Sequence, residues 1–176
     1  MELDGVPWVR NQLQILSLES QRMPKSPVHE FGRVHEYPFQ SVGTIGTHDM
    51  STFRGWWEED KELTERFYHQ ELGHWGNVPE HAPEWLCEEV IRQHLESPSM
   101  LCILTWQDWT SMDGALRNPD INIERINVPA DPRHYWRWRM HITLEELMKQ
   151  DEFNEYIRSM IEESGRSVSE QTEDAE

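Results

Sequence analysis

Three short apolar segments alternate along the chain with segments of helical periodicity, and this order restricts the fold to a few architectures. The segments cover residues 15–21, 40–45 and 100–105, and each predicts a strand because its apolar residues alternate or run without interruption. Strands separated by helices pair in parallel, with the helices crossing over the sheet. The sequence therefore predicts an α/β fold built on a parallel sheet.

Proline and glycine residues delimit the predicted helices in the first two thirds of the chain. A short helix over residues 7–14 leads into the first strand, and helical spacing covers residues 51–72 with breaks. The next helix begins at Pro83, a residue that suits a first helical turn, and ends before Pro98. The helical stretches over residues 51–72 and from Pro83 onward lie between the second and third predicted strands and supply the crossover there.

The C-terminal third is predicted to contain little sheet. A helical turn over residues 107–112 is followed by a long polar loop over residues 113–135. Thr143 and Glu146 have the spacing of a capping box, and apolar residues over 153–161 recur at helical spacing. We expect a final helix there.

The predicted sheet is small for an α/β protein. The apolar run over residues 100–105 is typical of a strand covered by helices on both faces. Three strands leave two open edges, and apolar edges invite association with further strands. The chain is therefore expected to be part of a larger α/β unit.

The net charge excludes several classes of partner. The chain has 16 Lys and Arg residues against 33 Asp and Glu residues, which gives a formal charge of −17. Nucleic-acid binding and docking on anionic lipid both favour basic surfaces, so neither partner is expected. The nine tryptophans indicate either an aromatic core or indole rings displayed to a ligand.

The cysteines and the N-terminus predict a cytoplasmic protein. Cys87 and Cys102 lack the spacing of a metal site and are expected to be free thiols in a reducing compartment. The longest apolar run, residues 100–106, is far shorter than the ~20 residues that span a bilayer. Residues 1–5 lack the apolar core of a signal peptide, and residues 164–176 are expected to form a disordered acidic tail.

The pair His48 and Asp49 follows the second predicted strand directly. Ligands of α/β folds bind beyond the carboxyl ends of strands, so this position favours a functional role. A loop pair that caps the next helix explains the same residues equally simply. Residues 52–58 likewise read either as an amphipathic helix with buried indoles or as a Trp and Arg surface near a sugar.

Arginine and tryptophan are interleaved in the segment 117–139, which holds five Arg and three acidic residues. Such a segment could stack with bases, bind the C–H faces and hydroxyls of sugars, or close the fold as a salt-bridged loop. The overall charge disfavours the first alternative.

Metal and nucleotide sites find little support. His69 and His74 are five positions apart, unlike the i, i+4 pair of a zinc helix, and His81 and His94 lack a carboxylate at diagnostic spacing. The sequence contains no P-loop and no Gly-x-Ser-x-Gly elbow.

Seven segments, taken in order, resemble the 4-alpha-glucanotransferases, the amylomaltases or disproportionating enzymes of glycoside hydrolase family 77. The segments that carry this resemblance are residues 11–19, 21–25, 47–52, 54–60, 107–108, 124–129 and 134–141. It covers about residues 6–150 and agrees in both order and spacing. Membership would imply that residues 1–163 are the C-terminal portion of a (β/α)8 TIM barrel, about strands six to eight, with the barrel incomplete in this chain.

The resemblance also implies a chemistry. The family uses a retaining mechanism in which one carboxylate is the nucleophile and another carboxyl is the acid and then the base. A third carboxylate, matched by Asp49, stabilises the oxocarbenium-like transition state. The other matched positions are sugar-binding His48, Asn127, Trp136 and Arg137, the neighbouring Pro129, and the supporting residues Arg54, Trp56 and Trp57.

The chain departs from the family at its start. The family's nucleophile and acid/base both precede the Val-Pro that matches Val6 and Pro7, and Glu2 stands too close to that pair to be the acid/base. We therefore expect a fragment that is inactive alone, whose partners are an α-1,4-glucan or maltooligosaccharide and the missing N-terminal part of the barrel. The resemblance implies no metal and no organic cofactor. The alternative is a non-catalytic glucan-binding protein derived from the same barrel.

Overall fold

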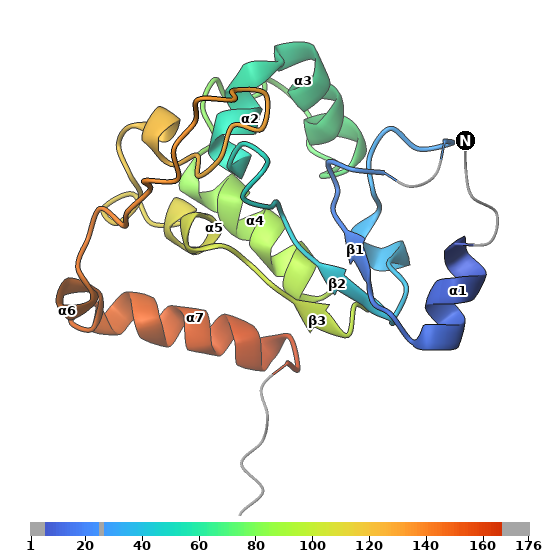
Figure 1. The fold of residues 1–176 in the computed structure, drawn as a ribbon. Coiled ribbons are helices and arrows are strands. Elements are labelled where there is room, and N and C mark those ends of the chain that lie inside the picture. Colours follow the sequence, from blue (N-terminus) through green and yellow to red (C-terminus); the bar gives the residue numbers. More distant parts are fainter. Residues whose placement is uncertain (1–5, 25–26, 167–176) are drawn as a thin grey trace, which may run out of the picture.

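The computed structural model describes residues 6–24 and 27–166, and its three strands lie within the predicted segments, with a 3-10 helix between the first two and three helices between the last two (Figure 1). The elements are α1 (Val6–Leu13), β1 (Ser17–Glu19), the 3-10 helix η1 (Val34–Glu36), β2 (Ser41–Gly43), α2 (Phe53–Glu59), α3 (Lys61–Gln70), α4 (Glu84–Leu95), β3 (Leu101–Cys102), α5 (Trp106–Ser111), the 3-10 helix η2 (Ile121–Ile123), α6 (Leu144–Leu147) and α7 (Asp151–Glu163).

The three strands form one parallel sheet in the order β1-β2-β3, which confirms the predicted sheet. Leu18, Val42 and Leu101 lie in register across it. The strands are shorter than predicted because the chain turns soon after each one. The backbone N–H of Ile103 still donates to the carbonyl of Gly43 at 3.0 Å, but Thr105 already caps the next helix.

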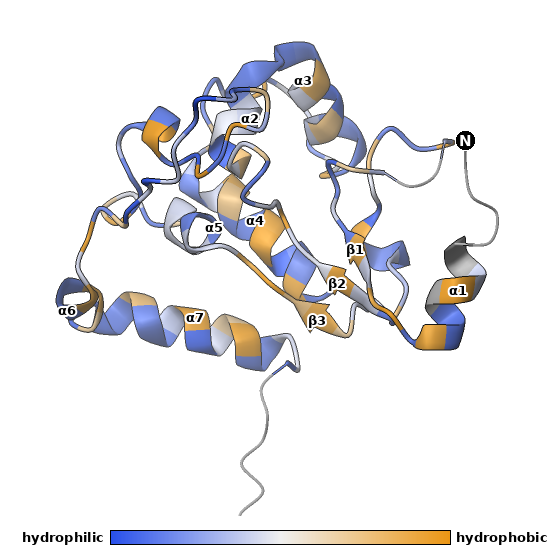
Figure 2. Ribbon diagram, viewed as in Figure 1, coloured by the Kyte–Doolittle hydropathy of each residue, from blue (hydrophilic) through white to orange (hydrophobic). Residues whose placement is uncertain are grey.

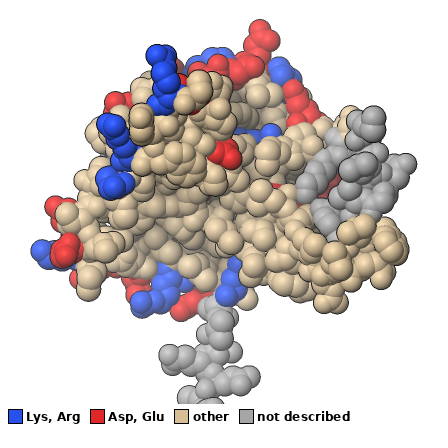
Figure 3. Space-filling view, in the orientation of Figure 1, with Lys and Arg blue, Asp and Glu red and all other residues tan. Residues whose placement is uncertain are grey.

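The expectation that helices cover both faces of β3 is wrong for the described residues. One face of the sheet is buried and carries small polar side chains, including Ser17 and Ser41. The other face carries apolar side chains that remain exposed, namely Leu18, Leu101 and Ile103. Figure 2 shows apolar residues along β2, β3 and α1, and Figure 3 shows few charged side chains over the middle of the same view. An uncovered apolar sheet face is the opposite of the usual arrangement.

The predicted helical stretch over residues 51–72 is two helices. Asp60 separates α2 from α3 with an extended backbone (φ −143°, ψ 102°). Its carboxylate accepts from the N–H of Leu63 at 3.0 Å and so caps α3. A residue with a short polar side chain thus ends one helix and begins the next.

The core lies among α2, α3 and α4 and is rich in aromatic rings. Trp57 and Phe67 are fully buried, and the ring of Phe67 meets those of Phe31 and Trp56 edge to face with centroids 5.2 Å apart. Such pairs contribute roughly 0.5–1.5 kcal/mol each beyond their area burial. Aromatic packing therefore fixes α2, which directly follows the loop after β2.

The C-terminal elements agree with the sequence. The hydroxyl of Thr143 accepts from the N–H of Glu146 at 3.2 Å, and Glu146 reaches back to the N–H of Thr143 at 2.7 Å. This confirms the capping box. The predicted final helix is α7, which packs on α4. The guanidinium of Arg166 donates to the carbonyl of Ser97 at 2.6 Å, and the rest of the expected tail, residues 167–176, lies outside the described residues.

Neither cysteine is bonded to a partner sulfur. Burial raises the pKa of both the Cys87 and Cys102 thiols to about 11. Within residues 6–24 and 27–166, no helix combines the length and the apolar character needed to cross a membrane.

Candidate active site

The loop after β2 projects Asp49 and is held at its base by buried and partly buried hydrogen bonds. The hydroxyl of Thr44 donates to the carbonyl of Gly46 at 2.8 Å, and the guanidinium of Arg22 donates to the carbonyl of Ile45 at 3.1 Å. The N–H of Met50 donates to the carbonyl of Thr47 at 3.0 Å, which makes a tight turn. His48 and Asp49 occupy the middle of this turn, and about half of each side chain is exposed.

Asn127 connects this turn to a distant loop. Its side-chain amide donates to Asp49 Oδ1 at 2.6 Å, and its backbone N–H donates to the carbonyl of His48 at 3.1 Å. His48 Nε2 lies 3.4 Å from the same carboxylate oxygen. Asp49 is thus oriented by two neighbours while it still faces solvent.

The aromatic residues of the C-terminal loop lie beside this group. The rings of Trp136 and His48 are 5.0 Å apart between centroids, and Trp136 is 60% exposed. The guanidinium of Arg137 lies over the ring of Tyr135 at 4.9 Å. The structure therefore brings His48, Asp49, Asn127 and Trp136 together. The guanidinium of Arg137 packs on Tyr135 instead.

A buried ion pair lies beneath the two loops. Arg54 Nη1 donates to Glu124 Oε1 at 2.6 Å, and the hydroxyl of Thr52 donates to Glu124 Oε2 at 3.1 Å. Burial raises the pKa of the Glu124 carboxyl, although Arg54 and Thr52 oppose this shift. A buried carboxylate that accepts several hydrogen bonds fixes the relative positions of the elements that carry it and its partners. Glu124 ties the start of α2 to the loop that carries Asn127.

Glu124 and Arg22 were not among the residues that the sequence indicated as functional. Both occur in segments that resemble the family, which was the available signal. Arg22 Nη1 donates to the carbonyl of Ser51 at 2.8 Å, and burial lowers the pKa of its guanidinium to about 10. Arg22 and buried Asp108 line a small cavity of about 20 Å³. That volume fits about one water molecule. Burial raises the pKa of the Asp108 carboxyl.

The tryptophans that follow the turn lie inside the protein. Trp57 is fully buried, and its indole N–H donates to the carbonyl of Pro79 at 2.9 Å. Trp56 is almost fully buried, with the guanidinium of Arg22 over its ring at 5.7 Å. These two indoles position α2 and offer little surface to a ligand.

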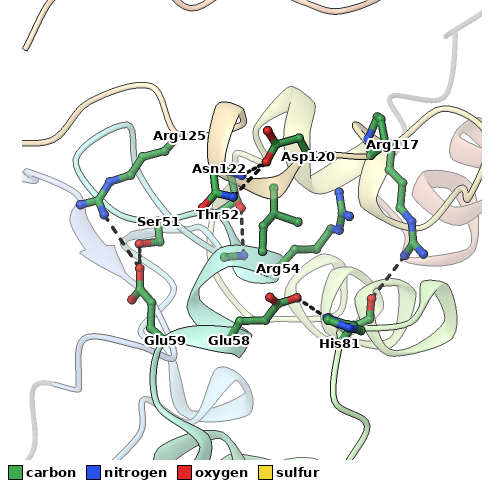
Figure 4. A pocket seen from close by; sticks show the side chains of 14 residues that line it. Ser51, Thr52, Arg54, Glu58, Glu59, His81, Arg117, Asp120, Asn122 and Arg125 are labelled. Atoms are coloured by element: carbon green, nitrogen blue, oxygen red, sulfur yellow. Dashed lines mark hydrogen bonds and ion pairs between the residues drawn. The ribbon is translucent and has the colours of Figure 1, made fainter.

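A cavity of about 700 Å³ lies next to the turn and is not lined by Asp49 (Figure 4). Ser51 and Thr52 belong to its wall. In the described part of the chain, no group of three or more His, Cys, Asp or Glu side chains could hold a metal ion.

Comparisons of this chain with a family model and with known proteins agree on one family. Residues 1–145 match the model of glycoside hydrolase family 77, described as 4-alpha-glucanotransferase. A 4-alpha-glucanotransferase of rice (Oryza sativa subsp. japonica) is 34% identical over 168 residues, which are 96% of this chain and 18% of the rice protein. A 4-alpha-glucanotransferase of Aquifex aeolicus is 28% identical over 85% of this chain and 29% of its own length.

A solved structure shares the fold. Amylomaltase from Streptococcus agalactiae, in complex with acarbose, superposes with a TM-score of 0.68 at 16% identity. The match covers 96% of this chain and 31% of the amylomaltase chain. This chain thus spans less than a third of the length of each of these relatives.

Proposed function

The chain belongs to glycoside hydrolase family 77, the 4-alpha-glucanotransferase family, and we propose that it forms part of an enzyme that transfers α-1,4-glucan segments between maltooligosaccharides. The observation that carries this proposal is the exposed Asp49 carboxylate, held by Asn127 at 2.6 Å beyond the end of β2. This is the edge of a parallel sheet where ligands of α/β folds bind.

Asp49 acts as the carboxylate that stabilises the transition state in a retaining mechanism. The substrate sugar becomes oxocarbenium-like as its glycosidic bond breaks, and a fixed negative charge nearby lowers the energy of that state. Orientation by Asn127 supports this role because a preorganised charge needs no rearrangement during the reaction. His48, Asn127, Trp136 and Arg137 bind the sugar, with the Trp136 ring against its C–H face.

Arg54, Trp56 and Trp57 support the site without touching the sugar. Arg54 pairs with Glu124 beneath the loops, and the two indoles belong to the aromatic core. Their part is to hold the start of α2 and the Asn127 loop at a fixed separation.

Residues 1–163 form about strands six to eight of a (β/α)8 barrel. The parallel sheet and its exposed apolar face, with Leu18, Leu101 and Ile103, support this assignment because the remaining strands of a barrel would cover that face. The two free thiols support a reducing compartment such as the cytoplasm.

The 176 residues alone do not catalyse the transfer. A retaining mechanism needs a nucleophile and an acid/base carboxyl about 5 Å apart. The segments that resemble the family supply neither, so Asp49 has no glycosyl-enzyme intermediate to stabilise. Glucose release from maltotriose tests this statement, and turnover by the isolated chain would contradict it.

Binding of maltotriose to the chain tests the site itself. We expect the indole signal of Trp136 and the side-chain amide signal of Asn127 to shift in NMR spectra as maltotriose is added. Asp49→Asn should weaken this binding, whereas Asn77→Ala, which alters an exposed asparagine in the α3–α4 turn, should not. Shifts that are identical in the Asp49→Asn variant and the unmodified chain would remove Asp49 from the site.

A further inference from the structure

We propose that the cavity of about 700 Å³ behind the Asp49 turn is a second, non-catalytic binding site for a neutral, hydroxyl-rich sugar. The volume lies in the range of roughly 300–1,000 Å³ that small-molecule sites occupy. Its walls come from α2, from residues 81–82 and from the segment 117–125 (Figure 4). Asp49, Asn127 and Trp136 do not line it, so it is separate from the proposed transfer site.

The charge of the cavity selects against anionic ligands. Three guanidinium groups line it, and so do three carboxylates. Arg117 pairs with Glu84 at 2.9 Å and buried Arg54 pairs with Glu124 at 2.6 Å. With these two partners, three guanidinium groups face five carboxylates (3 − 5 = −2), so an anion entering the cavity would be repelled.

The hydrogen-bonding capacity of the walls matches hydroxyl groups. Glu58 Oε1 accepts from the ring Nδ1 of His81 at 2.6 Å, and Arg125 Nη1 lies 3.9 Å from Glu59 Oε1. A carboxylate retains acceptor sites after one such contact, and a guanidinium retains donors. A sugar hydroxyl both donates and accepts, so it can use both kinds of group at once.

Apolar side chains complete the cavity. Ala82, Pro119 and Ile121 lie among the charged residues of its wall. Apolar surface interspersed with convergent polar groups is the usual composition of a ligand site, and it suits the C–H face of a pyranose ring. The choice of a short α-glucan such as maltose among neutral sugars rests on the proposed function, whereas the preference for a neutral polyol does not.

A maltose titration of the 176-residue chain tests the proposal, with backbone amide shifts as the readout. The probes are the amides of Ala82 and Asn122 for the cavity, and Asn127 and the Trp136 indole for the transfer site. We expect the cavity probes to shift with a dissociation constant in the range of about 1 mM, which is a weak affinity. These shifts should persist in the Asp49→Asn variant.

Two matched variants test the cavity directly: one blocks it and the other, its control, leaves it open. Asn122→Trp places a large side chain at the wall from an exposed position, and it should weaken maltose binding at the cavity probes at least tenfold. Ile123→Trp alters the neighbouring exposed residue of η2, which does not line the cavity, and should leave the affinity unchanged. Equal affinity in both variants would overturn the proposal.

Two further outcomes separate this proposal from the transfer site. Shifts confined to Asn127 and Trp136 would overturn the second site and leave the proposed function intact. Shifts at Ala82 and Asn122 without any at Asn127 and Trp136 would support the second site and count against the proposed function. A sugar phosphate that binds the cavity more tightly than maltose would overturn the argument from charge.

Discussion

The side-chain amide of Asn127 donates to Asp49 Oδ1 at 2.6 Å, although the two residues are 78 positions apart in the sequence. The contact joins the turn after β2 to the loop that precedes the Trp136 segment. It leaves the second carboxylate oxygen of Asp49 available to a sugar. The proposed site therefore depends on two loops that only the folded chain brings together.

Removal of Asn127 should impair transfer without unfolding the protein. A hydrogen bond to a charged group contributes about 1.5–3 kcal/mol, so Asn127→Ala should lower kcat/KM roughly 10- to 100-fold. The measurement is glucose release from maltotriose by a chimera in which residues 6–163 replace the matching part of the rice relative. The chimera with Asn77→Ala is the control and should retain full activity; equal rates in the two would exclude a role for Asn127.

The buried pair of Arg54 and Glu124 should dominate the stability of the site. Arg54→Met leaves Glu124, which is 2% exposed, without its cation, and such a loss costs about 3–5 kcal/mol. Arg66→Met breaks the exposed pair with Glu30, which solvent screens, and should cost far less. Urea unfolding of both variants measures the difference, and comparable losses would show that Glu124 is solvated.

The aromatic core should respond to truncation far more than the exposed indole. Trp57→Ala empties a fully buried position and should lower the free energy of unfolding by about 3–5 kcal/mol. Trp75→Ala alters a side chain that is 90% exposed and should change it by about 0.5 kcal/mol or less. Thermal unfolding followed by circular dichroism checks both, and a small effect at Trp57 would contradict the described core.

Acidification should destabilise the protein through His94. Burial lowers the pKa of the His94 imidazole to about 4, from an ordinary value near 6.5. Between these values the unfolded chain binds a proton that the folded chain does not, so stability falls as the pH falls from about 6.5 to 4, by up to about 3 kcal/mol.

A variant isolates this contribution from the buried carboxyl groups. The raised pKa values of Asp108 and Glu124 act in the opposite sense, because those groups take up protons more readily in the folded state. His94→Gln retains a neutral polar side chain and should remove the loss in this pH window. An unchanged pH profile in urea unfolding would show that His94 is accessible to protons.

The order of elements was predictable because it depends on local periodicity. The predicted strands contain β1, β2 and β3, and the capping box of Thr143 and Glu146 formed as its spacing required. Strand lengths were overestimated because the apolar run continues to Leu104, whereas β3 ends at Cys102, and Ile103 lies on the exposed face of the sheet. Periodicity cannot distinguish a covered face from an uncovered one.

The site was predictable in part. The position of His48 and Asp49 after a strand indicated a ligand site, and the resemblance supplied Asn127 and Trp136. The supporting charges of Arg22 and Glu124 were not recognised, because a buried charge depends on partners distant in the sequence, such as Arg54, 70 positions from Glu124. The second cavity lies between segments of different elements and leaves no local signal.

The role of Asp49 is tested most directly by glucose release from maltotriose in the chimera that carries residues 6–163, with and without Asp49→Asn. The variant keeps the size of the side chain and removes its charge, so kcat should fall by about 10²–10³-fold, the usual effect of removing one preorganised electrostatic group. The control Asp151→Asn, at the exposed start of α7, should match the unmodified chimera. An Asp49→Asn chimera as active as that control would contradict the assignment of Asp49 to the transfer site.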